Sequence, residues 1–128
     1  MISYVENFLK EEECSFFIQL FNHGKIEDWT DNVYSFSFID LLKLDLYFDK
    51  FSSCDFDRFR VQRVNEKTKI VNHFHSHYLP CSFVIFLNEE FKGGELVFED
   101  RTFTPKTGDM VYFSGDAGHK VNSTVGDR

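Results

Sequence analysis

The sequence predicts an α+β fold in which helices come first and a β-sandwich or barrel follows. Two observations lead to this class: apolar stripes of helical period near the N-terminus, and a series of short Phe- and Val-rich segments in the remainder of the chain. With 128 residues, 42% of them hydrophobic, the chain can bury one core and form a single domain.

Residues 10–24, KEEECSFFIQLFNHG, predict the first helix. Its first turn is acidic, which suits the positive end of the helix dipole, and Gly24 is placed to end it. Four apolar side chains fall at i, i+3, i+4 and i+7 and share one face: Cys14, Phe17, Ile18 and Phe21.

Residues 38–51, FIDLLKLDLYFDKF, predict a second helix by the same spacing, with one apolar side formed by Leu41, Leu44, Phe48 and Phe51. Both helices are expected to pack on a sheet. We therefore expect one domain over residues 1–128, with helical support over residues 1–56 and a β-barrel over residues 57–128.

The predicted strands are short and separated by turns that contain Gly93, Gly94 and Gly108. Regularly spaced short strands are typical of a sandwich or barrel. The segments are residues 57–64, 69–78, 82–88, 95–100, 101–105 and 110–114.

The net charge and the cysteine content of the chain limit the kinds of partner and the cellular compartment that we expect for the protein. The net charge of −7 argues against nucleic acid as a partner. The three cysteines show no CxxC spacing, which is typical of reduced thiols in a cytoplasmic protein. The sequence has no secretory leader at its start and no apolar run long enough to span a membrane, so we expect a soluble, cytoplasmic protein without a membrane partner.

The segment NHFHSHY, residues 72–78, contains three of the five histidines of the chain. In a strand, residues two apart face the same side about 6.6 Å apart, so His73, His75 and His77 form one row. Two neighbours in this row can converge on a metal about 2.1 Å from each nitrogen, whereas the outer pair is too far apart. His75 belongs to both possible pairs.

A further ligand would have to come from elsewhere, and His119 follows the predicted strand at residues 110–114. Two ligands from one strand and one from a distant strand leave part of the metal open, as in non-haem iron oxygenases. The residues alone leave other readings open, namely a solvated edge strand or an adventitious metal binder.

Four segments follow one another along the chain in a recognisable order: YVENFLKEEECSFFIQLFN, FRVQRV, FVIFLNEEFKGGELVF and FTPKTGDMVYFSGDAGHKV. His119 and Arg128 are separated by eight residues, an H-x(8)-R spacing. In this order and at these spacings the segments resemble the iron(II)/2-oxoglutarate-dependent dioxygenase superfamily, on the branch of prolyl 4-hydroxylase-like proteins, where the H-x(8)-R spacing separates the distal metal ligand from the basic residue that holds 2-oxoglutarate.

The resemblance implies a double-stranded β-helix, a jelly-roll or cupin-like barrel, with N-terminal supporting helices. It implies a dioxygenase that couples oxidative decarboxylation of 2-oxoglutarate to hydroxylation of a C–H bond, with Fe(II) as the metal. A peptidyl residue such as proline and a small molecule are both compatible substrates. His119 would be the distal ligand and Arg128 the anchor of the 2-oxoglutarate carboxylate, a task that suits a planar guanidinium.

The row departs from the usual H-x-D motif of the family, because it contains no Asp. Relatives with an N-x-x-H-x-H pattern and a following Ser match Asn72 and Ser82 and favour His75 and His77 as the ligand pair. A gapless comparison with the prolyl-hydroxylase type gives His73 and His75 instead. We expect the metal ligands to be His75, His77 and His119.

Three neutral imidazoles also suit zinc, copper or nickel. Two further functions therefore stay open: a three-histidine, cupin-like metalloenzyme that does not use 2-oxoglutarate, and a non-catalytic binding module. In the family a further strand follows the basic residue, so we expect either that the chain is truncated after Arg128 or that the barrel lacks an edge strand.

Overall fold

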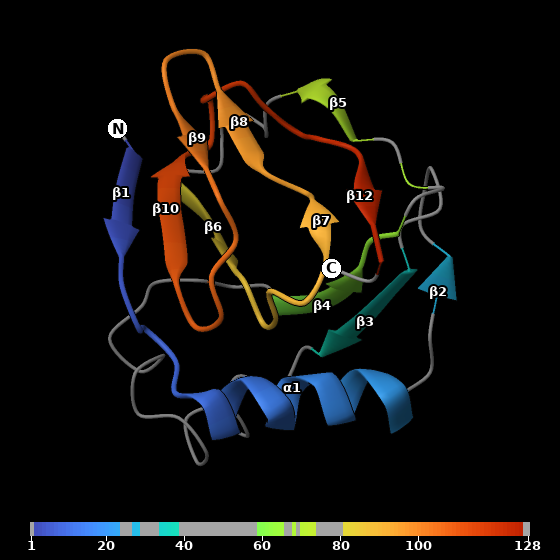
Figure 1. Ribbon diagram of the computed structural model, residues 1–128. Helices are drawn as coiled ribbons and strands as arrows, with labels where there is room; N and C mark the ends of the chain where they lie inside the picture. The colour runs from blue at the N-terminus through green and yellow to red at the C-terminus, as the bar shows by residue number, and fades with distance from the viewer. Residues whose placement is uncertain are drawn as a thin grey trace.

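The structure is a computed structural model, which describes residues 2–23, 27–28, 34–38, 59–65, 68, 70–73 and 81–126 (Figure 1). Within these residues the chain is mostly β-structure with one α-helix. The elements are β1 Ile2–Val5, α1 Glu11–His23, β2 Glu27–Asp28, β3 Tyr34–Phe38, β4 Phe59–Arg63, β5 Ile70–His73, β6 Cys81–Ile85, β7 Lys92–Gly93, β8 Leu96–Phe98, β9 Thr102–Phe103, β10 Met110–Ser114, β11 His119–Val121 and β12 Thr124–Val125.

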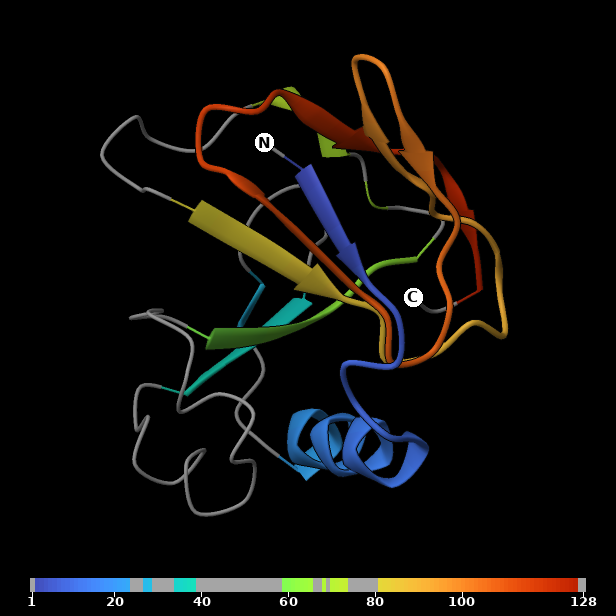
Figure 2. The ribbon, with the colours of Figure 1, turned by 90° about the vertical axis from the view of Figure 1, so that its left-hand side faces the viewer.

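Helix α1 forms where the apolar stripe predicts it. The backbone N–H of Lys10 donates to the Glu13 carboxylate at 2.8 Å, which satisfies a donor that the first turn would otherwise leave unpaired. Cys14, Phe17 and Phe21 are buried on the inner face. In Figure 1 α1 runs along the bottom of the molecule, and in Figure 2 it is seen nearly end-on; in both views β3 and β4 lie above it.

The strands form four antiparallel sheets. The orders are β1-β10-β6, β5-β11-β8-β9, β2-β3-β4 and β12-β7. Figure 2 shows β1, β10 and β6 side by side. The paired register is continuous in the first of these sheets, where Val111 of β10 lies opposite Tyr4 of β1 and Val84 of β6.

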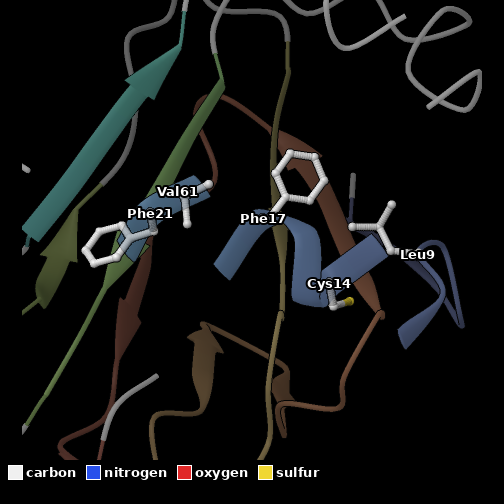
Figure 3. Packing of buried hydrophobic residues seen from close by; sticks show 5 residues of the cluster. All are labelled: Leu9, Cys14, Phe17, Phe21 and Val61. Atoms are coloured by element: carbon white, nitrogen blue, oxygen red, sulfur yellow. The ribbon is translucent and has the colours of Figure 1, made fainter. Parts of the chain in front are cut away.

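Two apolar clusters fill the interior. The first joins α1 to the sheets through Leu9, Cys14, Phe17, Phe21 and Val61, with Phe83 and Ile85 of β6 packed against it (Figure 3). The second lies between β8 and β10 and consists of Phe86, Leu96, Phe98, Val111 and Phe113. Val84 of β6 packs on the second cluster, so successive residues of this strand contribute to different clusters.

The N-terminal strand is fixed to β10 by a carboxylate. Asp109, 4% exposed, accepts a hydrogen bond from the Tyr4 hydroxyl and another, at 2.9 Å, from the backbone N–H of Asn7. The neighbouring Gly108 has φ +88° and accepts at 3.0 Å from the Leu9 N–H. These contacts hold the turn after β1 against the start of β10.

The structure differs from the expected division into helices and then strands. The first 56 residues contribute β1, β2 and β3 beside α1. The segment YSFSF of β3 alternates aromatic and polar residues, which is a strand period. The second predicted helix, residues 38–51, lies outside the described residues except for Phe38, which ends β3.

The strands predicted after residue 57 agree more closely with the structure. Residues 110–114 form β10 over the whole predicted segment, and β4, β6 and β8 lie within or one residue beyond theirs. Gly93 does not simply turn the chain, because it belongs to β7 and pairs with Thr124. Among the described residues no helix is long and apolar enough to cross a membrane.

Candidate metal site

His119 is the first residue of β11 and one of the few buried polar side chains, at 4% exposed. It follows the turn after β10, which carries the chain from one large sheet to the other. An imidazole in such surroundings must satisfy its ring nitrogens with specific partners.

One of these nitrogens has its partner in the preceding loop. His119 Nδ1 lies 2.9 Å from the carbonyl oxygen of Ala117. Because a carbonyl can only accept, Nδ1 must carry the hydrogen in this contact. In the neutral ring the lone pair is then on Nε2, the atom that would bind a metal.

Two phenyl rings enclose the imidazole. The centroid of the Phe113 ring lies 4.8 Å from that of His119 at an interplanar angle of 61°, and the centroid of Phe98 lies 5.7 Å away. Phe98 and Phe113 also contact each other edge-on at 5.1 Å. The environment of His119 is therefore apolar on these sides, which excludes water and strengthens any electrostatic contact made there.

The register of the sheet brings the histidine-rich segment to His119. On one side His119 pairs with His73 of β5, and on the other side it pairs with Phe98 of β8. Directly paired residues of an antiparallel sheet lie on the same face, with Cα atoms about 4.5–5.5 Å apart. Positions 73, 119 and 98 thus form one row across three strands.

For the other predicted site residues the structure describes no side chain. His75, His77 and Arg128 lie outside the described residues, and for His73 the structure describes the backbone of β5. The described part of the chain contains no group of three His, Cys, Asp or Glu side chains close enough to hold a metal. Of the predicted ligands, the structure describes one in full, His119.

His119 nevertheless suits a metal ligand. It is buried, its Nδ1 is engaged by a backbone carbonyl, and it lies opposite the segment that contains the histidine row. A second-sphere carbonyl on one ring nitrogen is the usual arrangement for a histidine that binds a metal through the other.

No motif in the sequence pointed to Phe98, Phe113 or the Ala117 carbonyl as parts of this site. The period-2 patterns of LVF and MVYFS place Phe98 and Phe113 on buried faces, so their burial was foreseeable. Their proximity to His119 was not, because it depends on pairing between segments far apart in the sequence.

Comparisons with known proteins agree with these observations. The family model described as the 2OG-Fe(II) oxygenase superfamily matches residues 49–128. No protein with a curated description is matched in sequence.

Solved structures are similar over nearly the whole chain. An oxidoreductase of the 2OG-Fe(II) oxygenase family from Burkholderia pseudomallei is 19% identical with a TM-score of 0.74, covering 99% of this chain and 80% of that chain. The viral collagen prolyl hydroxylase of Paramecium bursaria Chlorella virus-1, in its 2OG complex, is 14% identical with a TM-score of 0.72, covering 98% and 90%. The likeness shows the fold of these oxygenases, a double-stranded β-helix, as the family resemblance implies.

Proposed function

The chain belongs to the 2OG-Fe(II) oxygenase superfamily, and from this premise we propose that it is an iron(II)- and 2-oxoglutarate-dependent dioxygenase that hydroxylates its substrate. The observation that carries the proposal is the state of His119. Its Nδ1 is engaged by the Ala117 carbonyl, and its position lies opposite His73 of the histidine-rich segment. This arrangement supports Nε2 of His119 as one metal ligand.

The remaining ligands are two neighbours of the row His73, His75 and His77. His75 with His77 stays the prediction from the sequence pattern. The pairing of position 73 with position 119 favours His73 with His75, because directly opposed residues are close enough to share an ion. His75 belongs to both sets and is the residue on which the two assignments agree.

Bound iron(II) would supply the redox chemistry that couples decarboxylation of 2-oxoglutarate to hydroxylation. The residues of the protein would bind the metal and 2-oxoglutarate, orient them, and shield them from water. His119 would hold the metal, and the rings of Phe98 and Phe113 exclude water from its inner side. Arg128 would grip the far carboxylate of 2-oxoglutarate through a bidentate pair. Neutral imidazoles leave the metal's full charge to attract this dianion.

We propose a small-molecule or peptide substrate, with a prolyl residue as one candidate. The support for a prolyl residue is that a viral collagen prolyl hydroxylase has the same fold. The net charge of −7 favours a neutral or basic substrate over a nucleic acid. A cytoplasmic location stays a prediction from the cysteine pattern.

The test combines a binding signal with turnover. Anaerobic addition of Fe(II) and 2-oxoglutarate to the purified protein should give a weak visible charge-transfer band, and admission of oxygen should give succinate. His119→Ala and His75→Ala should abolish both signals. Arg128→Ala should weaken 2-oxoglutarate binding by about tenfold or more, because it removes the charge pair with the far carboxylate. His23→Ala, at the end of α1, is the matched control and should behave as wild type.

Two further variants decide between the ligand pairs. If His73 is a ligand, His73→Ala should abolish the band and His77→Ala should leave it; the reverse result would assign His77. A wild-type protein that gives neither the band nor succinate would end the proposal.

The lack of an Asp in NHFHSHY favours a second candidate, a three-histidine metalloenzyme that does not use 2-oxoglutarate. In that case metal binding and activity should survive Arg128→Ala unchanged. If the chain is instead a non-catalytic binding module, His119→Ala should leave partner binding intact.

A further inference from the structure

The imidazole of His119 is restrained from three segments of the chain. The loop before β11 supplies the Ala117 carbonyl, 2.9 Å from Nδ1. The neighbouring strand β8 supplies Phe98, with ring centroids 5.7 Å apart. The opposite sheet supplies Phe113 from β10, whose ring centroid lies 4.8 Å from that of His119.

The hydrogen bond and the two ring contacts restrain different properties of the imidazole. The carbonyl selects the tautomer, whereas rotation of the imidazole about its Cβ–Cγ bond is a separate freedom that packing can limit. The two phenyl rings remove this freedom because they occupy the space into which the imidazole would turn. Phe113 is fully buried, and Phe98 is itself held edge-on by Phe113 at 5.1 Å.

We propose that Phe98 and Phe113 are positioning residues that hold the His119 imidazole in its metal-binding orientation before any metal arrives. The inference rests on the proposed function in one respect, namely that His119 is a metal ligand. Neither phenyl ring has a donor atom, so neither contacts the metal as a ligand. They act through the orientation and tautomer of His119.

Orientation matters because a metal ligand must lie within about 10–20° of its productive geometry. An imidazole that samples several tilts and both tautomers binds only from a fraction of its population, which weakens the apparent affinity in proportion. Loss of the groups that support a metal-binding histidine costs about 10–100-fold in metal affinity. We expect Phe98→Leu and Phe113→Leu to weaken metal binding roughly tenfold.

The test uses Co(II) alone as the metal probe and Phe103→Leu as the matched control. Phe103 belongs to the same stack of rings, but its contacts are with Phe98 and Tyr4. Two quantities are measured for each variant: the Co(II) dissociation constant, and the tautomer of His119 in the metal-free protein by ¹H–¹⁵N NMR, with His119→Ala identifying the signal.

Wild type and Phe103→Leu should show one Nδ1–H tautomer and equal Co(II) affinity. Phe98→Leu and Phe113→Leu should show averaged or mixed tautomer signals together with weaker binding. Phe98→Met and Phe113→Met, whose unbranched and flexible side chains can fill an irregular gap in the core, replace any leucine variant that does not fold.

The positioning inference is overturned if the two leucine variants keep wild-type affinity and tautomer, or if Phe103→Leu weakens binding as much as they do. The NMR measurement separates this failure from that of the proposed function. If wild type binds no Co(II), or if His119→Ala binds it equally well, the metal assignment fails, while the tautomer in the metal-free variants still judges the positioning role.

Discussion

The carboxylate of Asp109 offers a quantitative test of how the N-terminal strand is attached. Asp109 is buried and accepts from both the Tyr4 hydroxyl and the Asn7 backbone N–H, at 2.9 Å for the latter. A hydrogen bond to a charged group contributes about 1.5–3 kcal/mol when its partners are shielded from water. Tyr4 is 37% exposed, so water can replace part of this contact and we reduce its contribution to about 1 kcal/mol.

Asp109→Ala removes both contacts and should therefore lower the free energy of unfolding by about 2.5–4 kcal/mol, and Tyr4→Phe should lower it by about 1 kcal/mol. Tyr4→Phe preserves the stacked contact with Phe103, whose ring is 5.4 Å away, and so removes the hydroxyl alone. Because Tyr4 and Asp109 share one contact, their effects should not add. The double variant should be more stable than the sum of the single losses implies, by about 1 kcal/mol.

The assay is urea unfolding monitored by circular dichroism. If the slope m of unfolding free energy against urea concentration is the same among variants, a shift in the urea midpoint reports a change in stability. Asp116→Ala removes an exposed carboxylate from the turn after β10 and should change stability by less than about 0.5 kcal/mol. If Tyr4→Phe costs the same with and without Asp109, the carboxylate is not the partner of Tyr4 and the reasoning is refuted.

Two further predictions concern the same region. Burial, and then the hydrogen bond and negative charge of Asp109, raise the pKa of Tyr4 above that of a free phenol. The stabilisation that comes from the protonated Tyr4 hydroxyl is therefore complete below about pH 10 and is lost as pH rises further. Above that pH, the free energy of unfolding should depend less on pH in Tyr4→Phe than in wild type. Gly108→Ala should destabilise the protein by about 2 kcal/mol or more, because φ is +88° and the added Cβ would lie 2.3 Å from the Leu9 carbonyl oxygen; a thermal midpoint equal to wild type would contradict this.

Local patterns in the sequence were sufficient for much of the fold. The helical spacing of Cys14, Phe17 and Phe21 predicted the buried face of α1, and the alternation in MVYFS predicted β10. The same kind of alternation is present in YSFSF of β3, but residues 34–37 precede the predicted second helix and lie in none of the predicted elements. This strand was not predicted although its signal is present in the sequence.

The site was less predictable because it depends on contacts between distant segments. His119 was identified by its spacing from neighbouring motifs, yet its partners come from β8, β10 and the loop before β11. Pattern matching favoured His75 and His77 as the companion ligands, whereas the register places His73 opposite His119. A register between strands is set by packing of the whole sheet, and no local property of NHFHSHY determines it.

Strand β6 contributes side chains to both apolar clusters. Phe83 and Ile85 pack on the first cluster, which includes α1, and Val84 packs on the second cluster, between β8 and β10. Adding or deleting a single residue within this strand would exchange the side chains offered to the two compartments. A single insertion or deletion would therefore disrupt the packing of both apolar clusters. Length changes in this family member should therefore be confined to its loops, whereas conservative replacements within β6 should be tolerated one side at a time.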